Sequence, residues 1–263
     1  VDARHGVVEQ SRRHAVIGAL LGIRHVVVCV NKMDLVDFKE SAFRSIQNDL
    51  HALLKELKIE SHHFIPISAL KGDNVVESSE RMPWYKDGPL LPHLENLELP
   101  NRTQNAPFRM PVQYVIRPLS NEYHDYRGYA GTIASGSIEV GEEIAVMPFG
   151  ATTTITAIES PQGEVSSAGE AEAVTIRVSD NLDISRGAML TSSTEKPQTD
   201  NTLDATICWM GERSSLKMGT MLRITHTTHT ARAMVSALEC KIDINQISVT
   251  ESCEELKLNE IGQ

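Results

Sequence analysis

Aromatic side chains are scarce in this sequence, at 5% of the residues, so a core built from its 41% hydrophobic residues is mostly aliphatic. No apolar run approaches the roughly 20 residues that a bilayer-spanning helix needs. The opening stretch VDARHGVVEQSRRH is charged and lacks the apolar segment of a signal peptide. The sequence therefore indicates neither a membrane protein nor a secreted one, and we expect a cytoplasmic location.

Cysteine is also rare. The four residues Cys29, Cys208, Cys240 and Cys253 are far apart and form no C-x-x-C pair. This pattern favours reduced thiols over a disulfide framework or a zinc site. The ten histidines have no carboxylate or thiol partner at ligand spacing, so we predict no metal site.

Basic residues are outnumbered by acidic ones, and the formal net charge is −10. The imbalance lies mainly in residues 101–263, which carry 13 basic and 21 acidic side chains. Non-specific nucleic-acid binding depends on Lys and Arg that neutralise phosphates. The acidic second part of the chain therefore argues against a nucleic-acid partner.

Residues 1–100 alternate apolar, strand-like runs with amphipathic stretches, which indicates an α/β domain with parallel strands. We expect a helix that stops at Gly22, followed by a strand over residues 25–30. HFIPIS at 63–68 is typical of a second buried strand. The clearest helical stripe consists of Phe43, Ile46, Leu50, Leu53, Leu54 and Leu57.

After a polar linker at 101–107 the apolar period becomes two, as in SIEVGEEIAV and AVTIRV. Residues 108–192 are therefore predicted to form an antiparallel β-barrel domain. A second linker at 193–201 precedes a β-rich region, residues 202–263, with strands such as MLRITHTTH. This region ends at NEIGQ without an obvious closing strand, so we expect a second barrel that is truncated.

The first predicted strand runs directly into NKMD, residues 31–34. Asp34 can offer two carboxylate oxygens to the N1–H and the N2 amino group of guanine, donors that adenine lacks as a pair. Asn31 would bond the Hoogsteen edge of the base and tie neighbouring loops together. The aliphatic stem of Lys32 would lie over the flat base. The tetrapeptide alone is a weak signal, since a solvated turn at a strand end can have the same composition.

The second strand ends in Ser68-Ala69-Leu70, 37 residues after Asn31. Open α/β sheets bind ligands at the carboxyl ends of neighbouring parallel strands, so both loops should meet there. We predict that the Ala69 N–H faces guanine O6 and that the Ser68 hydroxyl braces the loop. The predicted guanine-binding site consists of Asn31, Lys32, Asp34, Ser68, Ala69 and Leu70.

No G-x-x-x-x-G-K-[ST] motif, which would hold the phosphates, occurs in residues 1–263. GTIASGSI, residues 131–138, has two glycines at the right spacing but lacks the lysine. It also lies in the β-rich part of the chain. Gly131 and Gly136 are therefore predicted to serve turns or bulges.

These motifs carry a family resemblance. VDARHGV, VNKMDLV, ISAL and GDNV resemble the second half of a translation-factor-type P-loop GTPase domain. FRMPVQYVIRP, DYRGYAGTIASGSIEVGEEIAVMP and ISRGAML resemble the β-barrel that follows it. DARHGVVEQSRRH, SSERMPWYKDGPLLPHLE and ICWM more closely resemble the large, GTP-hydrolysing subunit of bacterial sulfate adenylyltransferase. The resemblance covers essentially the whole chain.

The resemblance implies a regulatory subunit with GTP and Mg²⁺ as cofactors and a small catalytic subunit as partner. In that family, GTP hydrolysis drives formation of adenosine 5′-phosphosulfate and pyrophosphate from ATP and sulfate. The family's phosphate loop, switch threonine and D-x-x-G-H element would lie upstream of Val1. We therefore expect a fragment that has no catalytic residue, binds no cofactor and is inactive alone.

Two alternatives remain open. An elongation factor of the 1A type shares the architecture and has a string similar to MPWYKDG, although the acidic residues 101–263 count against tRNA binding. The other alternative is a non-catalytic module that docks a protein partner and uses no nucleotide.

Overall fold

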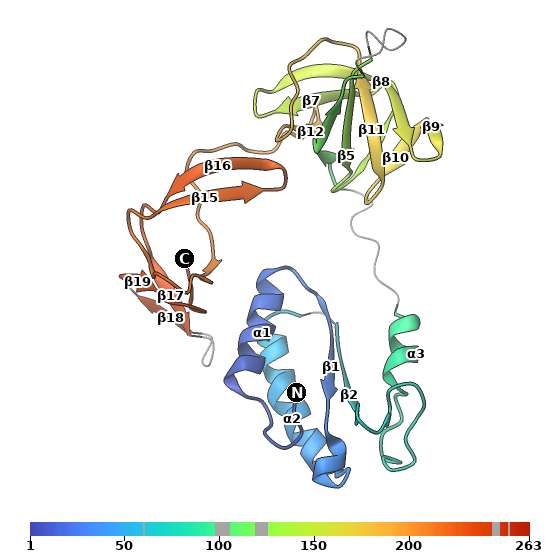
Figure 1. The fold of residues 1–263 in the computed structure, drawn as a ribbon, viewed down its shortest axis with the longest axis vertical. Helices are drawn as coiled ribbons and strands as arrows, with labels where there is room; N and C mark the ends of the chain where they lie inside the picture. The colour runs from blue at the N-terminus through green and yellow to red at the C-terminus, as the bar shows by residue number, and fades with distance from the viewer. Residues whose placement is uncertain (60, 98–105, 119–125, 244–247, 252) are drawn as a thin grey trace. The chain divides into compact units, whose positions relative to one another are not determined.

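The computed structural model describes residues 1–59, 61–97, 106–118, 126–243, 248–251 and 253–263. The chain divides into two compact units, each with its own hydrophobic core. One unit comprises Val1–Leu99, Asp204–Met218 and Ser236–Gln263. The other comprises Pro100–Leu203 and Gly219–Val235. Figure 1 allows the chain to be followed through both units by colour.

Residues 1–97 contain the predicted α/β arrangement. The elements are α1 (Glu9–Leu20), β1 (His25–Val30), the 3-10 helix η1 (Met33–Val36), α2 (Glu40–Glu56), β2 (Ser61–Pro66) and α3 (Leu90–Glu95). Strands β1 and β2 are parallel and in register from the pair His25–Ser61 to the pair Val30–Pro66. Figure 1 shows α2 alongside these two strands. The parallel α/β organisation expected from the sequence is confirmed.

The predicted apolar stripe holds α2 against the strands. Its buried residues pack in one cluster with Val30, Met33 and Phe64, and they are Phe43, Ile46, Leu50, Leu53 and Leu54. Complete burial of one such side chain stabilises the fold by about 1.5–3 kcal/mol relative to exposure. Because Val30 and Met33 flank the end of β1, this packing also fixes the start of the following loop.

Helix α1 ends where the sequence predicts. Gly22 has a φ of +75°, a conformation that suits glycine. The Gly22 N–H donates to Ala19 O at 2.9 Å, and the Ile23 N–H donates to Gly18 O at 3.0 Å. These two bonds form a Schellman motif, which satisfies carbonyls at the helix end and turns the chain towards β1.

Residues 106–192, in the second unit, form antiparallel strands, as the period of two predicts for this part of the chain. They are β3 (Arg109–Pro111), β4 (Tyr114–Ile116), β5 (Gly128–Thr132), β6 (Ser137–Glu139), β7 (Glu143–Met147), β8 (Ala151–Ser160), β9 (Gly163–Val165), β10 (Ser167–Gly169), β11 (Ala173–Val178) and β12 (Met189–Ser192). Eight of them form one sheet in the order β3-β12-β7-β8-β11-β5-β4, with β9 beside β8. Its core is aliphatic apart from residues such as Tyr129 and Phe108.

The remaining strands differ in detail from the prediction. They are β13 (Ile207–Cys208), β14 (Leu216–Lys217), β15 (Met221–His226), β16 (His229–Met234), β17 (Cys240–Asp243), β18 (Ser248–Glu251), β19 (Glu255–Leu256) and β20 (Ile261–Gly262). The stretch MLRITHTTH is not one strand, because the chain turns at Thr227, which has a φ of 53°, and returns as β16.

A strand also forms in NEIGQ, where none was predicted. β20 pairs with both β13 and β17. Two residues are too few to show a periodicity in sequence, so only the pairing reveals this strand. Most of the predicted linker at 101–107 lies outside the described residues, and the domain boundaries drawn from the sequence remain predictions.

Candidate functional site

The NKMD and Ser68-Ala69-Leu70 loops follow the carboxyl ends of β1 and β2. Backbone hydrogen bonds join them, since the Ile67 N–H donates to Val30 O at 2.8 Å and the Met33 N–H donates to Ile67 O at 3.2 Å. The structure therefore brings the two loops of the predicted site to one edge of the parallel sheet.

Asn31 connects the two loops through its side chain. Its Oδ1 accepts hydrogen bonds from the Ala69 N–H at 3.0 Å and from the Lys32 N–H at 2.7 Å. Two backbone donors require an acceptor at this position, which fixes the orientation of the amide group. Within the described part of the chain the Nδ2 amino group has no partner, so it is available to a ligand.

Asp34 lies in the first turn of η1 and faces the second loop. The hydroxyl of Ser68, which is fully buried, donates to its Oδ1 at 2.7 Å. Among the described residues no group bonds Oδ2. One carboxylate oxygen is thus held in place, and the other remains able to accept from a ligand.

Lys32 has a left-handed backbone conformation, with φ 66° and ψ 34°. Residues other than glycine adopt it rarely, and such conformations are concentrated at functional sites. Its ammonium group forms an ion pair of 2.8 Å with Asp2 Oδ2. Asp2 is not among the predicted site residues, and the sequence offers no periodic signal for it.

Ala69 and Leu70 are the other two predicted site residues, and in this structure the Ala69 N–H is already bonded and the Leu70 side chain is exposed. The backbone N–H of Ala69, expected to face a base, instead donates to Asn31 in this structure. The side chain of Leu70 is 89% exposed, so it forms no wall of a preformed pocket. Its place in the guanine-binding site therefore stays a prediction based on its position in the loop.

Buried polar contacts support the second loop. The side chain of Asn74, only 2% exposed, donates from Nδ2 to Pro66 O at 2.9 Å. Its Oδ1 accepts from the Ser79 N–H at 2.7 Å. Asn74 therefore anchors the chain after Ala69 to the end of β2, a role that a single polar residue does not reveal in sequence.

The two glycines of GTIASGSI have backbone roles in the β-rich unit. A Cβ added to Gly131 would lie 2.5 Å from Pro111 O, and Gly136 has a φ of +71°. The prediction of a turn or bulge is wrong for Gly131, which lies inside β5 and permits close approach of two backbones. Gly136 lies at a bend with a positive φ, in line with the prediction.

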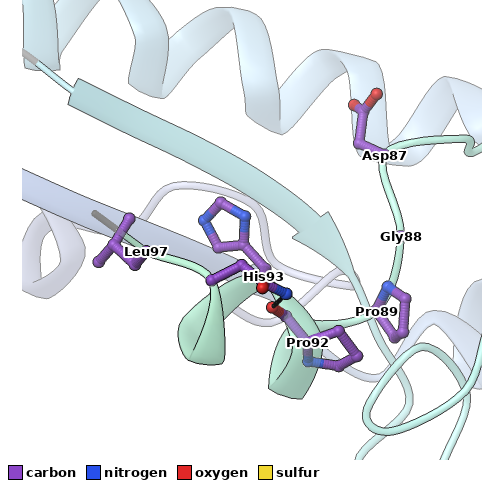
Figure 2. Close-up of a pocket in the computed structure, with 7 residues that line it drawn as sticks. Asp87, Gly88, Pro89, Pro92, His93 and Leu97 are labelled. Carbon is purple, nitrogen blue, oxygen red and sulfur yellow. Dashed lines mark hydrogen bonds between the residues drawn. The ribbon is translucent and has the colours of Figure 1, made fainter.

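A cavity of about 450 Å³ lies elsewhere, beside α3. It is lined by Asp87, Gly88, Pro89, Pro92, His93, Asn96 and Leu97. Figure 2 shows the His93 ring near Pro92 and the Asp87 carboxylate directed away from both. None of the predicted site residues lines this cavity, and His93 instead stacks on His63 with ring centroids 4.2 Å apart.

The described residues contain no group of three or more His, Cys, Asp and Glu side chains that could hold a metal ion. Likewise, no helix in the described ranges is long and apolar enough to span a bilayer.

Comparison with known proteins gives matches to two family models. Residues 1–114 match the elongation factor Tu GTP binding domain, and residues 202–263 match the GTP-eEF1A C-terminal domain-like family. Among solved structures, the chain resembles sup35 complexed with GMPPNP, at 25% identity and a TM-score of 0.51. That similarity covers 100% of this chain and 67% of the sup35 chain.

The similarity to curated proteins is stronger and covers 100% of this chain. The bifunctional enzyme CysN/CysC of Mycobacterium tuberculosis is 45% identical, and the match covers 43% of that protein. Sulfate adenylyltransferase subunit 1 of Aeromonas hydrophila is 42% identical, with 54% of its length covered. The chain thus spans about half the length of the curated relatives it matches. Together these similarities relate residues 1–114 to the GTP-binding domain of translation factors and relate the whole chain to sulfate adenylyltransferase subunit 1.

Proposed function

We propose that this chain contributes the guanine-recognition loops and β-domains of a GTP-binding regulatory subunit of sulfate adenylyltransferase. In this role, the whole enzyme couples GTP hydrolysis to formation of adenosine 5′-phosphosulfate from ATP and sulfate. The observation that carries the proposal is the convergence of Asn31, Asp34 and Ser68 at the ends of β1 and β2, in a chain 41–42% identical to proteins named sulfate adenylyltransferase subunit 1.

In the proposed complex, Asp34 accepts hydrogen bonds from the N1–H and the N2 amino group of guanine. Oδ2 is open to them, while the bond from Ser68 holds the carboxylate in orientation. The Nδ2 group of Asn31 donates to N7 of the base. The Ala69 N–H exchanges its bond to Asn31 for one to guanine O6. Adenine would leave the Asp34 carboxylate desolvated and without donors.

GTP and Mg²⁺ enter this proposal as cofactors of the whole enzyme. The polar groups at the ends of β1 and β2 suit a base in their chemistry, since Asn31 Nδ2 can donate and Asp34 Oδ2 can accept hydrogen bonds. When bound, GTP and Mg²⁺ would supply the phosphoryl chemistry. Residues 1–263 contribute to recognition of the base.

The partner in this proposal is the small catalytic subunit of the enzyme, since relatives carry the name subunit 1. The two β-rich regions, residues 108–192 and 202–263, are proposed to form β-barrels and to offer protein-docking surfaces. Their acidic balance disfavours nucleic acid. The names of the curated relatives favour this function over an elongation factor of the 1A type. A cytoplasmic site of action is part of the same proposal.

Two measurements test the proposal. An NMR titration of the ¹⁵N-labelled chain with GMP and AMP should show GMP-specific shifts at Asn31, Asp34 and Ala69. Co-expression with the small subunit of a sulfate adenylyltransferase should yield a complex that weakens with salt. The Aeromonas hydrophila subunit 1 with its own partner serves as the positive control. Equal responses to GMP and AMP would reject the base pocket, and failed co-purification of two folded proteins would count against the subunit role.

A further inference from the structure

Asp2 lies beside the first residue of NKMD, although 29 positions separate Asp2 and Asn31 in sequence. The N-terminal residues run parallel to the end of β1. The Asn31 N–H donates to Val1 O at 2.8 Å, and the Ala3 N–H donates to Asn31 O at 2.9 Å. These backbone bonds fix the position of Asp2 relative to the proposed guanine pocket.

The Asp2 carboxylate is bonded at both oxygens. Arg4 donates from its backbone N and Nε to Oδ1, at 3.0 and 3.1 Å, and from a terminal nitrogen to Oδ2 at 2.7 Å. The remaining donor to Oδ2 is Lys32 Nζ, at 2.8 Å. Hydrogen bonds from Arg4 and then Lys32 hold the pKa of Asp2 well below its usual range, so the carboxylate stays charged.

Lys32 is thereby restrained at both ends. Its backbone is fixed in the left-handed conformation, and its ammonium group is bound to Asp2. A free lysine side chain samples many rotamers and loses this freedom when it packs against a ligand. An anchor that is already present in the unliganded protein reduces that loss.

We propose that Asp2 is a positioning residue of the guanine pocket, which holds Lys32 Nζ so that the lysine stem forms a preorganised surface for the base. This inference rests on the proposed function. The inference adds Asp2, which lies outside both recognition loops, to the proposed pocket. Arg4 supports Asp2, because its hydrogen bonds orient the Asp2 carboxylate.

The test uses the ¹⁵N-labelled chain with GMP as the probe and AMP as the reference. Asp2→Asn should weaken GMP binding about two- to fivefold, in line with the modest energy of an exposed ion pair. Lys32→Met, which keeps the stem and removes the charge, should weaken it by a similar factor. In the Asp2→Asn, Lys32→Met double variant the effect should not increase further, because both changes remove one interaction.

Asp37→Asn is the matched control. Asp37 lies at the end of the same loop and pairs with Lys39 at 3.2 Å, and among the described residues no bond joins its side chain to Lys32. This variant should bind GMP like the unmodified chain. A general effect of removing one negative charge would instead appear in both aspartate variants.

The outcomes separate the inference from the function on which it rests. If the unmodified chain does not prefer GMP to AMP, the proposed base pocket fails. The positioning role is wrong if the unmodified chain prefers GMP but the Asp2→Asn variant binds GMP equally well. It is also wrong if the double variant binds GMP more weakly than Lys32→Met alone. Should Asp2→Asn not fold, the comparison of Lys32→Met with the unmodified chain decides: unchanged GMP affinity would overturn the proposal.

Discussion

The Ser68 hydroxyl donates a hydrogen bond of 2.7 Å to Asp34 Oδ1, across 34 positions of sequence. Ser68 is fully buried, whereas Asp34 is partly exposed at the sheet edge. The bond therefore ties a carboxylate that can reach a ligand to a fixed point of the core.

Loss of this bond should loosen the Asp34 carboxylate. We expect Ser68→Ala to weaken GMP binding about three- to tenfold, because one hydrogen bond contributes about 0.5–1.5 kcal/mol net. Parallel NMR titrations of both proteins would measure the ratio. Ser166→Ala, at an exposed position of the β-rich unit, is the control and should leave affinity unchanged.

Asp34→Asn should change the preferred base. The amide replaces a carboxylate acceptor by a donor, so it suits xanthine, which has a carbonyl where guanine has its amino group. We expect about tenfold or greater loss of GMP affinity, since bonds to a charged acceptor are worth about 1.5–3 kcal/mol, and a gain for XMP. Competition between GMP and XMP for the unmodified and variant proteins would measure the loss of GMP affinity and the gain of XMP affinity. Unchanged GMP affinity would remove Asp34 from the pocket.

The 263-residue polypeptide should bind GTP no better than it binds guanosine, and it should not hydrolyse GTP. Tight GTP binding in P-loop proteins draws heavily on contacts to the phosphates, and the sequence has no G-x-x-x-x-G-K-[ST]. A base held by a few hydrogen bonds should reach about millimolar affinity. Isothermal titration with both ligands is the measurement. Micromolar, Mg²⁺-dependent GTP binding would contradict the prediction.

Gly131 should be indispensable to the β-rich unit. Gly131→Ala places a Cβ 2.5 Å from Pro111 O and 3.1 Å from Met110 Cγ, so the sheet must shift. Overpacking of this kind destabilises by about 1–3 kcal/mol. Gly169→Ala is the matched control, because a Cβ there meets no atom within 4 Å. Urea midpoints, followed at amide signals of β5, should fall for the first variant only.

Acidification should destabilise the α/β part through His63. Burial, and next the neighbouring His93, lower the pKa of His63 in the folded state. The unfolded chain therefore binds more protons than the folded one in the window from about pH 6.5 downwards to the lowered pKa. Stability is lost as the pH falls through this window. His63→Gln should flatten the dependence, whereas the exposed His5→Gln should not. Thermal unfolding at pH 5–8 would test both.

The sequence by itself predicted the strands and the long helix around the candidate site, and the residues that form it. The spacing of Phe43, Ile46 and Leu50 predicts α2, because burial on one helical face depends on neighbours three or four positions apart. The apolar strand ahead of NKMD and the run HFIPIS likewise predict β1 and β2. Two loops that follow parallel strands must then meet at one sheet edge.

The tertiary structure alone decided which distant groups contact each other. Asp2 reaches Lys32 because the N-terminal residues add to β1 in parallel, and the Ala69 N–H reaches Asn31 because β2 lies in one particular register. The pairing of Ile261–Gly262 with two strands and the approach of Gly131 to Pro111 O have the same origin. Such contacts depend on strand register and chain path, which leave no periodic trace in the residues that make them.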